Sequence, residues 1–329
     1  MEQRYANILF DDAFKVVVCA PGNEPLLIKI VELLIPGKHI RSMELRDKEN
    51  HGLSVSDKIT TFDLFCTSET GEQFIVEMQY SPQKHYADRM LCYATYPIRA
   101  QLTRKMQLRK EKLQVGERIE SMDYGLLPVY VVSLLNFSIP HASADILEEG
   151  LISRYEIRNG RNGELMTPAL NFIYLELGCL GIKLGESEKC RTLLEKFAYS
   201  LKYMHKLGTR PDGFEEDLLK MLYDAAEFSN MTVEQQTDYE TIMRTELDII
   251  AEKAYARETG LAEGRAEGLS AGKAEGKAEG RAEGLAEGLA EGRAEAKAEI
   301  ARKLLEKGFS FADITEITGL SEEEFKKIR

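Results

Sequence analysis

Two acidic residues lie in short segments that are otherwise typical of buried strands. Segment 61–67 carries Asp63, and segment 73–80 carries Glu77 and Gln79. Apolar residues alternate along both segments, and a polar, glycine-containing stretch separates them. This pattern predicts a β-hairpin that holds two carboxylates and one amide.

The turn between the two strands sets the predicted pairing. If Gly71 takes the left-handed position of a three-residue loop, Ser68 pairs with Glu72. Counting back from this pair places Asp63 opposite Glu77. Because side chains alternate along a strand, we expect Gln79 on the same face as both carboxylates, and the core on the other face.

Paired carboxylates of this kind can bind a divalent metal ion. Directly opposed residues have Cβ atoms roughly 5 Å apart, so two like charges repel unless a cation lies between them. Oxygen ligands suit Mg²⁺, which can activate water in phosphodiester hydrolysis. The alternative is a hairpin with one solvated polar face, since 55 of the 329 residues are acidic.

The order and spacing of several motifs resemble the Rpn family, whose members are described as recombination-promoting nucleases or transposases of the PD-(D/E)XK nuclease superfamily. The motifs are Asp11-Asp12-Ala13-Phe14-Lys15, Gly22-Asn23-Glu24-Pro25-Leu26-Leu27, Phe62-Asp63, Glu77-Met78-Gln79 and a glycine-punctuated tail. The resemblance is clearest over residues 8–100 and in the tail. It implies a PD-(D/E)XK nuclease-like α/β fold, in which helices flank a mixed sheet.

The resemblance also implies roles for individual residues. Asp63 and Glu77 match the acidic metal ligands, and Asp11 matches an acidic residue of the first helix that completes the metal site. Gln79 stands where the superfamily motif has Lys, so it lacks the cation that lowers the pKa of the attacking water, but it can orient that water. The implied metal is Mg²⁺, with Mn²⁺ as a substitute.

Two residues on the helix after the hairpin match the family's Arg and Tyr behind the site. Arg89 and Tyr93 are four positions apart, so they share one helix face. The alternative is that both are ordinary residues at the boundary between core and surface.

The charge distribution leaves room for a DNA partner. The net charge is −12, which by itself argues against a nucleic-acid ligand. Residues 1–112, however, carry 16 Lys or Arg and 15 Asp or Glu. Cations gather near the end of this region, at Arg104, Lys105, Arg109, Lys110 and Lys112. This cluster either follows a phosphate backbone or forms the solvated face of a helix.

Apolar segments are too short to span a bilayer, and the N-terminal residues lack the pattern of a signal peptide. We therefore expect a cytoplasmic protein that does not associate with membranes.

The pattern along the chain predicts four parts: a nuclease-like domain over 1–185, a helical subdomain over 186–258, a repeat tail over 259–298 and a short helical interaction element over 299–329. Within the first part we expect a helix over 24–35, a strand near 40–46, the hairpin, a helix over 83–112 interrupted at Pro97, and strands over 127–134 and 170–177.

The repeat tail has glycine at every fourth position from Gly260 to Gly292. Each interior Gly costs a helix about 1 kcal/mol relative to Ala. Glu also recurs at the same four-residue spacing, so that like charges are neighbours on the helix surface and repel. A helix here would be marginal alone and would gain from a second chain. We therefore expect a homo-oligomer that forms through the tail, and a flexible spacer is the alternative.

The last segment regains an apolar face and has Ser310 and Ser321 as predicted helix N-caps. Two short helices joined near Gly319 are typical of a helix-turn-helix. Three acids, 322–324, open the second helix and would face phosphates, so we favour an interaction element over a DNA-reading one.

These observations point to a Mg²⁺-dependent DNA endonuclease linked to recombination or mobile elements. The first alternative is an inactive nuclease-fold protein that acts as a binding module through its helical tail. A transposase that catalyses strand transfer is a third class, and only the family name supports it.

Overall fold

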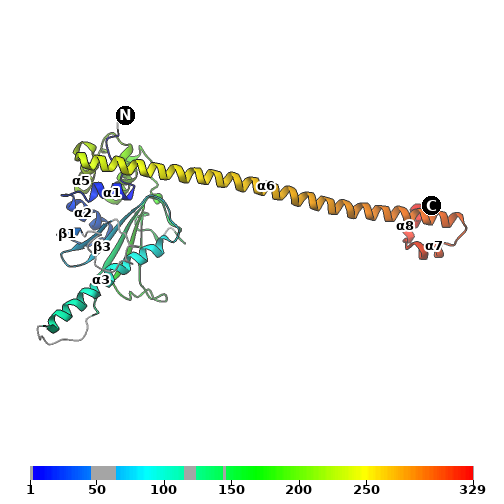
Figure 1. The fold of residues 1–329 in the computed structure, drawn as a ribbon, viewed down its shortest axis with the longest axis horizontal. Helices are drawn as coiled ribbons and strands as arrows, with labels where there is room; N and C mark the ends of the chain where they lie inside the picture. The colour runs from blue at the N-terminus through cyan, green and yellow to red at the C-terminus, as the bar shows by residue number, and fades with distance from the viewer. Residues whose placement is uncertain (1–2, 46–63, 115–123, 144–145, 329) are drawn as a thin grey trace. The chain divides into compact units, whose positions relative to one another are not determined.

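A computed structural model of the chain describes residues 3–45, 64–114, 124–143 and 146–328. Contacts divide the chain into two compact units, Met1–Asp248 and Ile249–Arg329. Within the described residues, the first unit contains a six-stranded sheet of order β1-β2-β3-β4-β6-β5 (Figure 1). Its strands are β1 (Met43–Leu45), β2 (Leu64–Ser68), β3 (Gln73–Gln79), β4 (Val129–Leu135), β5 (Ile152–Glu156) and β6 (Leu170–Glu176). The α-helices of the chain are α1 (Asp11–Val18), α2 (Glu24–Leu34), α3 (Tyr86–Gln114), α4 (Leu193–Tyr203), α5 (Asp217–Ala226), α6 (Val233–Glu306), α7 (Phe311–Thr318) and α8 (Glu322–Ile328).

The hairpin of β2 and β3 has the predicted register wherever it is described. Leu64 pairs with Val76, and Thr67 pairs with Gln73. The turn is closed by a hydrogen bond of 2.9 Å from Ser68 N to Glu72 O. Gly71 has φ +85°, the left-handed conformation that the turn requires. Asp63 lies outside the described residues, so its pairing with Glu77 stays a prediction.

The centre of the sheet is parallel. β3 pairs with β4 and β4 with β6 in parallel, whereas β1, β2 and β5 join antiparallel. The connection from β3 through α3 to β4 is a crossover between parallel strands. It places α3 against one face of the sheet, where residues of the helix and of the strands share one hydrophobic cluster.

The expected interruption of this helix at Pro97 is wrong, because α3 runs through it. Proline removes one backbone hydrogen bond and typically costs a helix about 3 kcal/mol. Pro97 is itself buried, and Met90, Tyr93 and Ala94 of the same helix are buried in the cluster against the sheet. Burial of this face offsets the missing hydrogen bond.

Helices α1, α2 and α5 contact one another, and α1 also contacts β3 (Figure 1). Cys19, at the end of α1, lies near Cys66 of β2. Phe65 belongs to the cluster under α3, and its neighbour Cys66 points to the other face of the sheet. Because Cys66 lies near Cys19, α1 covers the face opposite α3. The sheet is therefore covered on both faces by helices, as in an α/β fold.

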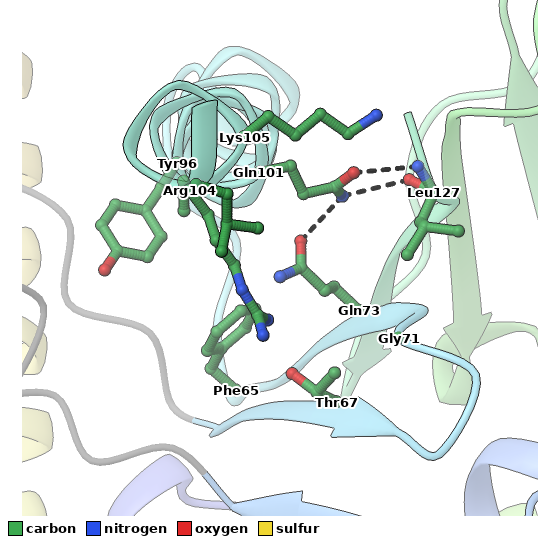
Figure 2. A pocket seen from close by; sticks show the side chains of 11 residues that line it. Phe65, Thr67, Gly71, Gln73, Tyr96, Gln101, Arg104, Lys105 and Leu127 are labelled. Carbon is green, nitrogen blue, oxygen red and sulfur yellow. Dashed lines mark hydrogen bonds between the residues drawn. The ribbon is translucent and has the colours of Figure 1, made fainter. Parts of the chain in front are cut away.

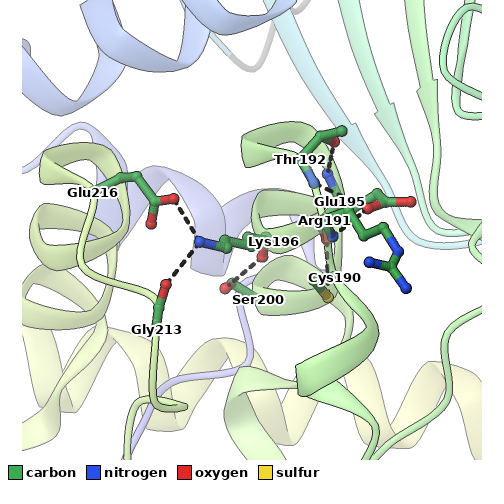
Figure 3. A network of polar contacts seen from close by, with 8 residues as sticks. All are labelled: Cys190, Arg191, Thr192, Glu195, Lys196, Ser200, Gly213 and Glu216. Carbon is green, nitrogen blue, oxygen red and sulfur yellow. Dashed lines mark hydrogen bonds and ion pairs between the residues drawn. The ribbon is translucent and has the colours of Figure 1, made fainter.

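Polar contacts join α4 to the loop before α5 (Figure 3). Thr192 and Glu195 form a capping box at the start of α4. One turn along the helix, Lys196 Nζ donates to Glu216 Oε1 at 2.6 Å and to Gly213 O at 2.7 Å. These contacts fix the helical region within the first unit, to which residues up to Asp248 belong. The division into four parts drawn from the sequence stays a prediction.

The second unit contains most of one long helix and two short ones. α6 spans 74 residues and includes the whole glycine repeat, whose side chains are almost all exposed. Ala301, Ile314, Leu320 and Phe325 form a small buried cluster that joins the end of α6 to α7 and α8. In the described part of the chain the repeat is thus helical, contrary to the flexible-spacer alternative.

No helix among the residues described is both long enough and apolar enough to cross a membrane.

Candidate active site on the α3 face of the sheet

Glu77 lies in the middle of the sheet and is only 2% exposed. It shares a face of β3 with Ile75, which packs in the cluster under α3. The expectation that core and polar groups occupy separate faces is therefore wrong, because α3 covers the face that carries Glu77. The solvated-face explanation of the acidic pair also fails for Glu77. A carboxylate is rarely buried unless it is paired, hydrogen-bonded or bound to a metal.

Polar side chains follow Glu77 across the sheet. In the parallel register Glu77 pairs with Ser133 of β4, and Ser133 pairs with Tyr174 of β6. Ser133 is fully buried, and its hydroxyl lies 3.7 Å from Met90 Sδ of α3. The sheet thus carries a row of polar groups beneath a helix.

Tyr86, at the start of α3, faces this row. Its hydroxyl is buried, and no described residue offers it a hydrogen bond of normal geometry. Burial raises the pKa of Tyr86 above its usual value; the Ser133 hydroxyl lowers it, and the Glu77 carboxylate raises it further. The phenol is therefore a neutral donor close to a buried carboxylate.

Arg89 and Tyr93 meet Gln79 at the end of β3. Arg89 Nη2 donates to Gln79 Oε1 at 2.6 Å, and Arg89 Nη1 donates to Gln83. The guanidinium lies over two rings, with centroid distances of 5.4 Å to Tyr86 and 5.5 Å to Tyr93. Arg89 and Tyr93, which the sequence placed on one helix face, thus contact each other, and the Arg89 cation lies over aromatic rings beside the Gln79 amide.

Arg89 Nε is buried and, like the Tyr86 hydroxyl, has no hydrogen-bond partner among the described residues. Two buried donors without partners beside a buried carboxylate are unusual in a folded protein. Such donors suit a polar guest, for example a water molecule or a phosphate oxygen.

The start of α1 lies beside the end of β3. The rings of Phe10 and Tyr80 stack with centroids 4.2 Å apart, and Asp11 directly follows Phe10. Asp11 is therefore near the same edge of the sheet as Gln79.

Asp63 lies outside the described residues. Among the residues that are described, no group of three or more His, Cys, Asp or Glu side chains could hold a metal ion. The donor types suit a hard cation: Glu77 is a buried carboxylate on the α3 face, and Asp63 directly precedes β2 in the hairpin. Asp11 begins α1 on the opposite face of the sheet, beside the end of β3.

Glu176 holds the loop that leaves β4, a role that no local sequence pattern indicates. Glu176 is fully buried, and its carboxylate accepts hydrogen bonds from Ile139 N at 2.9 Å, Ser153 Oγ at 2.7 Å and His141 Nε2 at 2.8 Å. A Cβ at Gly178 would stand 2.4 Å from the backbone nitrogen of Ser138. Only glycine lets the two backbones approach so closely.

The loop held by Glu176 borders the candidate site. Phe137 lies edge-on to Tyr86, with ring centroids 6.4 Å apart. Asn136 N donates to Gln79 O at 3.0 Å, and Asn136 Nδ2 donates to Tyr80 O at 3.3 Å. The buried carboxylate of Glu176 therefore supports the loop that carries Asn136 and Phe137, and through it the end of β3 beside Glu77.

The comparisons with known proteins bear first on the end of the chain. Residues 294–329 match a domain described as "Rpn/YhgA-like nuclease family, C-terminal HTH domain". Our preference against a helix-turn-helix is therefore wrong. Gly319 ends α7 in the left-handed conformation, and Ser321 and Glu324 exchange hydrogen bonds across the start of α8. One of the three acids that argued against DNA, Glu324, thus caps its own helix.

Neither the comparison with curated proteins nor that with solved structures gave a match. Residues 8–256 match the family described as "PD-(D/E)XK nuclease family transposase". This match covers more than half of the chain, and it extends past the predicted nuclease-like domain into the start of α6. It confirms the resemblance seen in the sequence and the α/β fold class. The protein therefore belongs to the Rpn group of the PD-(D/E)XK nuclease family of transposases.

Proposed function

We propose that the chain is a divalent-metal-dependent DNA endonuclease with its active centre at Glu77. The observation that carries this proposal is the burial of the Glu77 carboxylate, in a family of nucleases, beside the buried Tyr86 hydroxyl and Arg89 Nε, to which the described residues offer no hydrogen bond of normal geometry. Glu77, Asp63 and Asp11 would hold Mg²⁺ or Mn²⁺. When bound, the ion would make water a better nucleophile and stabilise charge on the scissile phosphate.

Gln79 and Arg89 share the role that the superfamily gives to a single Lys. The Gln79 amide can orient the attacking water but carries no charge. Arg89 places a permanent cation 2.6 Å from Gln79 Oε1. The guanidinium would therefore favour the hydroxide form of a nearby water and attract the phosphate.

Tyr86 would donate a hydrogen bond from its hydroxyl to an oxygen of the scissile phosphate. We expect Tyr86→Phe to lower the cleavage rate about tenfold, the size of one lost hydrogen bond to a charged group. Removal of a buried hydroxyl without a partner should leave the unfolding temperature unchanged or higher. Single-turnover cleavage and thermal unfolding of the same sample measure both effects. A slower variant that has also lost stability would contradict the assignment.

Two parts of the chain suit DNA as the substrate. The second half of α3 exposes Arg104, Arg109, Lys110 and Lys112 and contains one acid, Glu111. The C-terminal unit matches a helix-turn-helix domain, which is a common DNA-binding fold. We infer that both contribute to binding of the phosphate backbone.

Covalently closed plasmid tests the proposal, because it has no ends for an exonuclease. With Mg²⁺ the purified full chain should convert supercoiled plasmid into nicked and linear forms, and a chelator should stop the conversion. Plasmid that stays supercoiled with Mg²⁺ and with Mn²⁺ would favour the alternative of a nuclease-fold binding module. Joined DNA products would instead indicate strand transfer. A cytoplasmic location and a role in recombination remain predictions.

We also propose that two copies of the chain pair through the repeat helix. Within α6 the side chains of Leu261, Leu269, Leu285 and Leu289 are more than half exposed, and a Cβ at any repeat glycine would meet nothing within 4 Å. A long helix with so much glycine is marginal without a partner.

Light scattering of the full chain should therefore give at least a dimer. Leu285→Glu combined with Leu289→Glu should shift the full chain toward a monomer, because the two substitutions would place charges in the contact between the paired helices. Glu283→Gln combined with Glu287→Gln is the matched control and should keep the dimer. A monomeric parent would refute the pairing.

A further inference from the structure

A cavity of about 360 Å³ lies between the β2–β3 hairpin and the second half of α3 (Figure 2). Phe65, Tyr96, Leu108 and Leu127 supply apolar walls. The rings of Phe65 and Tyr96 meet edge to face, with centroids 6.2 Å apart. The cavity is separate from the row of polar groups around Glu77, and the proposed function leaves it without a role.

Amide side chains line the floor of this cavity. Gln101 Nε2 donates to Leu127 O at 3.1 Å and to Gln73 Oε1 at 2.9 Å, and Leu127 N donates to Gln101 Oε1 at 2.8 Å. In Figure 2 the nitrogen of the Gln73 amide points away from Gln101, toward the side where Arg104 lies. This nitrogen is a donor available to a guest.

The described residues that line the cavity carry positive charge. Arg104 and Lys105 are among them and none of them is acidic, although the chain has 55 Asp or Glu and only 43 Lys or Arg. Figure 2 shows the Arg104 guanidinium reaching toward Phe65 and Thr67. An anionic ligand with a flat apolar part would match these groups.

The cavity opens on the sheet face that carries Glu77. Gln73 and Glu77 are four positions apart on β3, so their side chains lie on the same face. Strand geometry separates them by about 13 Å. A nucleic-acid strand advances about 3.4 Å per nucleotide along a duplex, so this separation matches a few nucleotides. The strand would pass around α3, because Ile75 between the two residues is buried under the helix.

We propose that this cavity binds an unpaired base of the DNA strand that is cleaved at Glu77. The base would stack on Tyr96 or Phe65 and accept a hydrogen bond from the Gln73 amide, and Arg104 would contact the adjoining phosphate. A paired base is stacked within the duplex and cannot enter. The inference rests on the proposed function and adds a preference for single-stranded or locally unpaired DNA.

Binding measured in chelator tests the inference without any cleavage. Fluorescence anisotropy of the full chain should show a single-stranded oligonucleotide bound about tenfold tighter than the same sequence as a paired duplex. A 2-aminopurine base in the single strand should lose fluorescence on binding, because it becomes stacked.

Two variants address the cavity. Ala100→Leu fills part of it without a change in charge, because Ala100 lines it. Arg104→Glu reverses one of its cations. Each should weaken single-strand binding about tenfold and remove the fluorescence loss, with duplex binding less affected. Arg161→Glu is the matched control for the charge reversal, because Arg161 is exposed, lies outside α3 and does not line the cavity.

Equal affinity for the single strand and the duplex would overturn the inference. So would unchanged binding by Ala100→Leu and Arg104→Glu, or tighter binding of RNA than of DNA of the same sequence. Because no metal is present, these outcomes are separate from those of the plasmid assay. A chain that nicks plasmid but fails here keeps the proposed function and loses only the base cavity.

Discussion

Glu77→Gln is expected to abolish metal-dependent DNA cleavage while the protein stays folded. The amide keeps the size of the side chain but removes the negative charge that would bind the metal ion. Loss of a metal ligand should cost about 4 kcal/mol of transition-state stabilisation, or roughly a thousand-fold in rate. Because a buried charge is removed, the free energy of unfolding should fall by no more than about 1 kcal/mol. Single-turnover cleavage and thermal unfolding measure the two effects.

Glu72→Gln is the matched control for this variant. Glu72 belongs to the same hairpin and pairs with Lys38 at 2.5 Å, five positions before Glu77. Its loss should change cleavage by less than about threefold, because this half-buried ion pair lies at the other end of β3 from Gln79. Asp63→Ala should be as inactive as Glu77→Gln. A Glu77→Gln protein that cleaves as well as the control would place the active centre elsewhere.

Glu176→Ala is expected to give the largest loss of stability of any single change considered. Its carboxylate is fully buried and accepts from a backbone amide, a serine hydroxyl and a histidine. Alanine would leave three donors without an acceptor, which should cost about 4 kcal/mol of unfolding free energy. Since the loop it holds borders Tyr86, cleavage should fall as well.

Urea unfolding followed by near-ultraviolet circular dichroism measures this loss. The chain has no tryptophan, and all tyrosines except Tyr255 lie within residues 1–248, so the signal reports on the first unit. Glu148→Ala is the control, because the Glu148 side chain is half exposed and its partner among the described residues is Arg154, at 2.6 Å. It should cost at most about 1 kcal/mol. Equal effects of the two variants would show that Glu176 does not hold the loop.

The sequence predicted the hairpin well because two local signals agree there. Alternation fixes which residues share a face, and the left-handed Gly71 fixes the register. Helix α2 was equally clear, since Pro25 opens it and Pro36-Gly37 follows its end.

Elements without such signals were not predicted from the local pattern. Only the family resemblance implied a helix at Asp11, because α1 has eight residues and its N-cap, Phe10, makes no side-chain hydrogen bond. β5 has five residues at the sheet edge, and its second half is not buried. The run of α3 through Pro97 depends on burial against the sheet, which no local pattern reveals.

The candidate site was predicted in part. Glu77, Gln79, Arg89 and Tyr93 stood out by type and spacing, and the structure places Arg89 against both Gln79 and Tyr93. Ser133 joins them only through the parallel pairing of β3 with β4, which is 56 residues distant along the chain. His141 and Glu176 meet across 35 positions. Contacts between such distant residues leave no periodicity for sequence reasoning to detect.

The central claim is that Glu77 helps to hold a divalent ion, and Mn²⁺ titrated calorimetrically into the full chain tests it most directly. The parent protein should bind Mn²⁺ in a saturable manner, and Mg²⁺ should compete for the same site. Glu77→Gln should lose this binding, whereas Glu72→Gln should keep it. If Glu77→Gln binds Mn²⁺ as tightly as the parent protein does, the ion is held elsewhere and the proposed active centre is wrong.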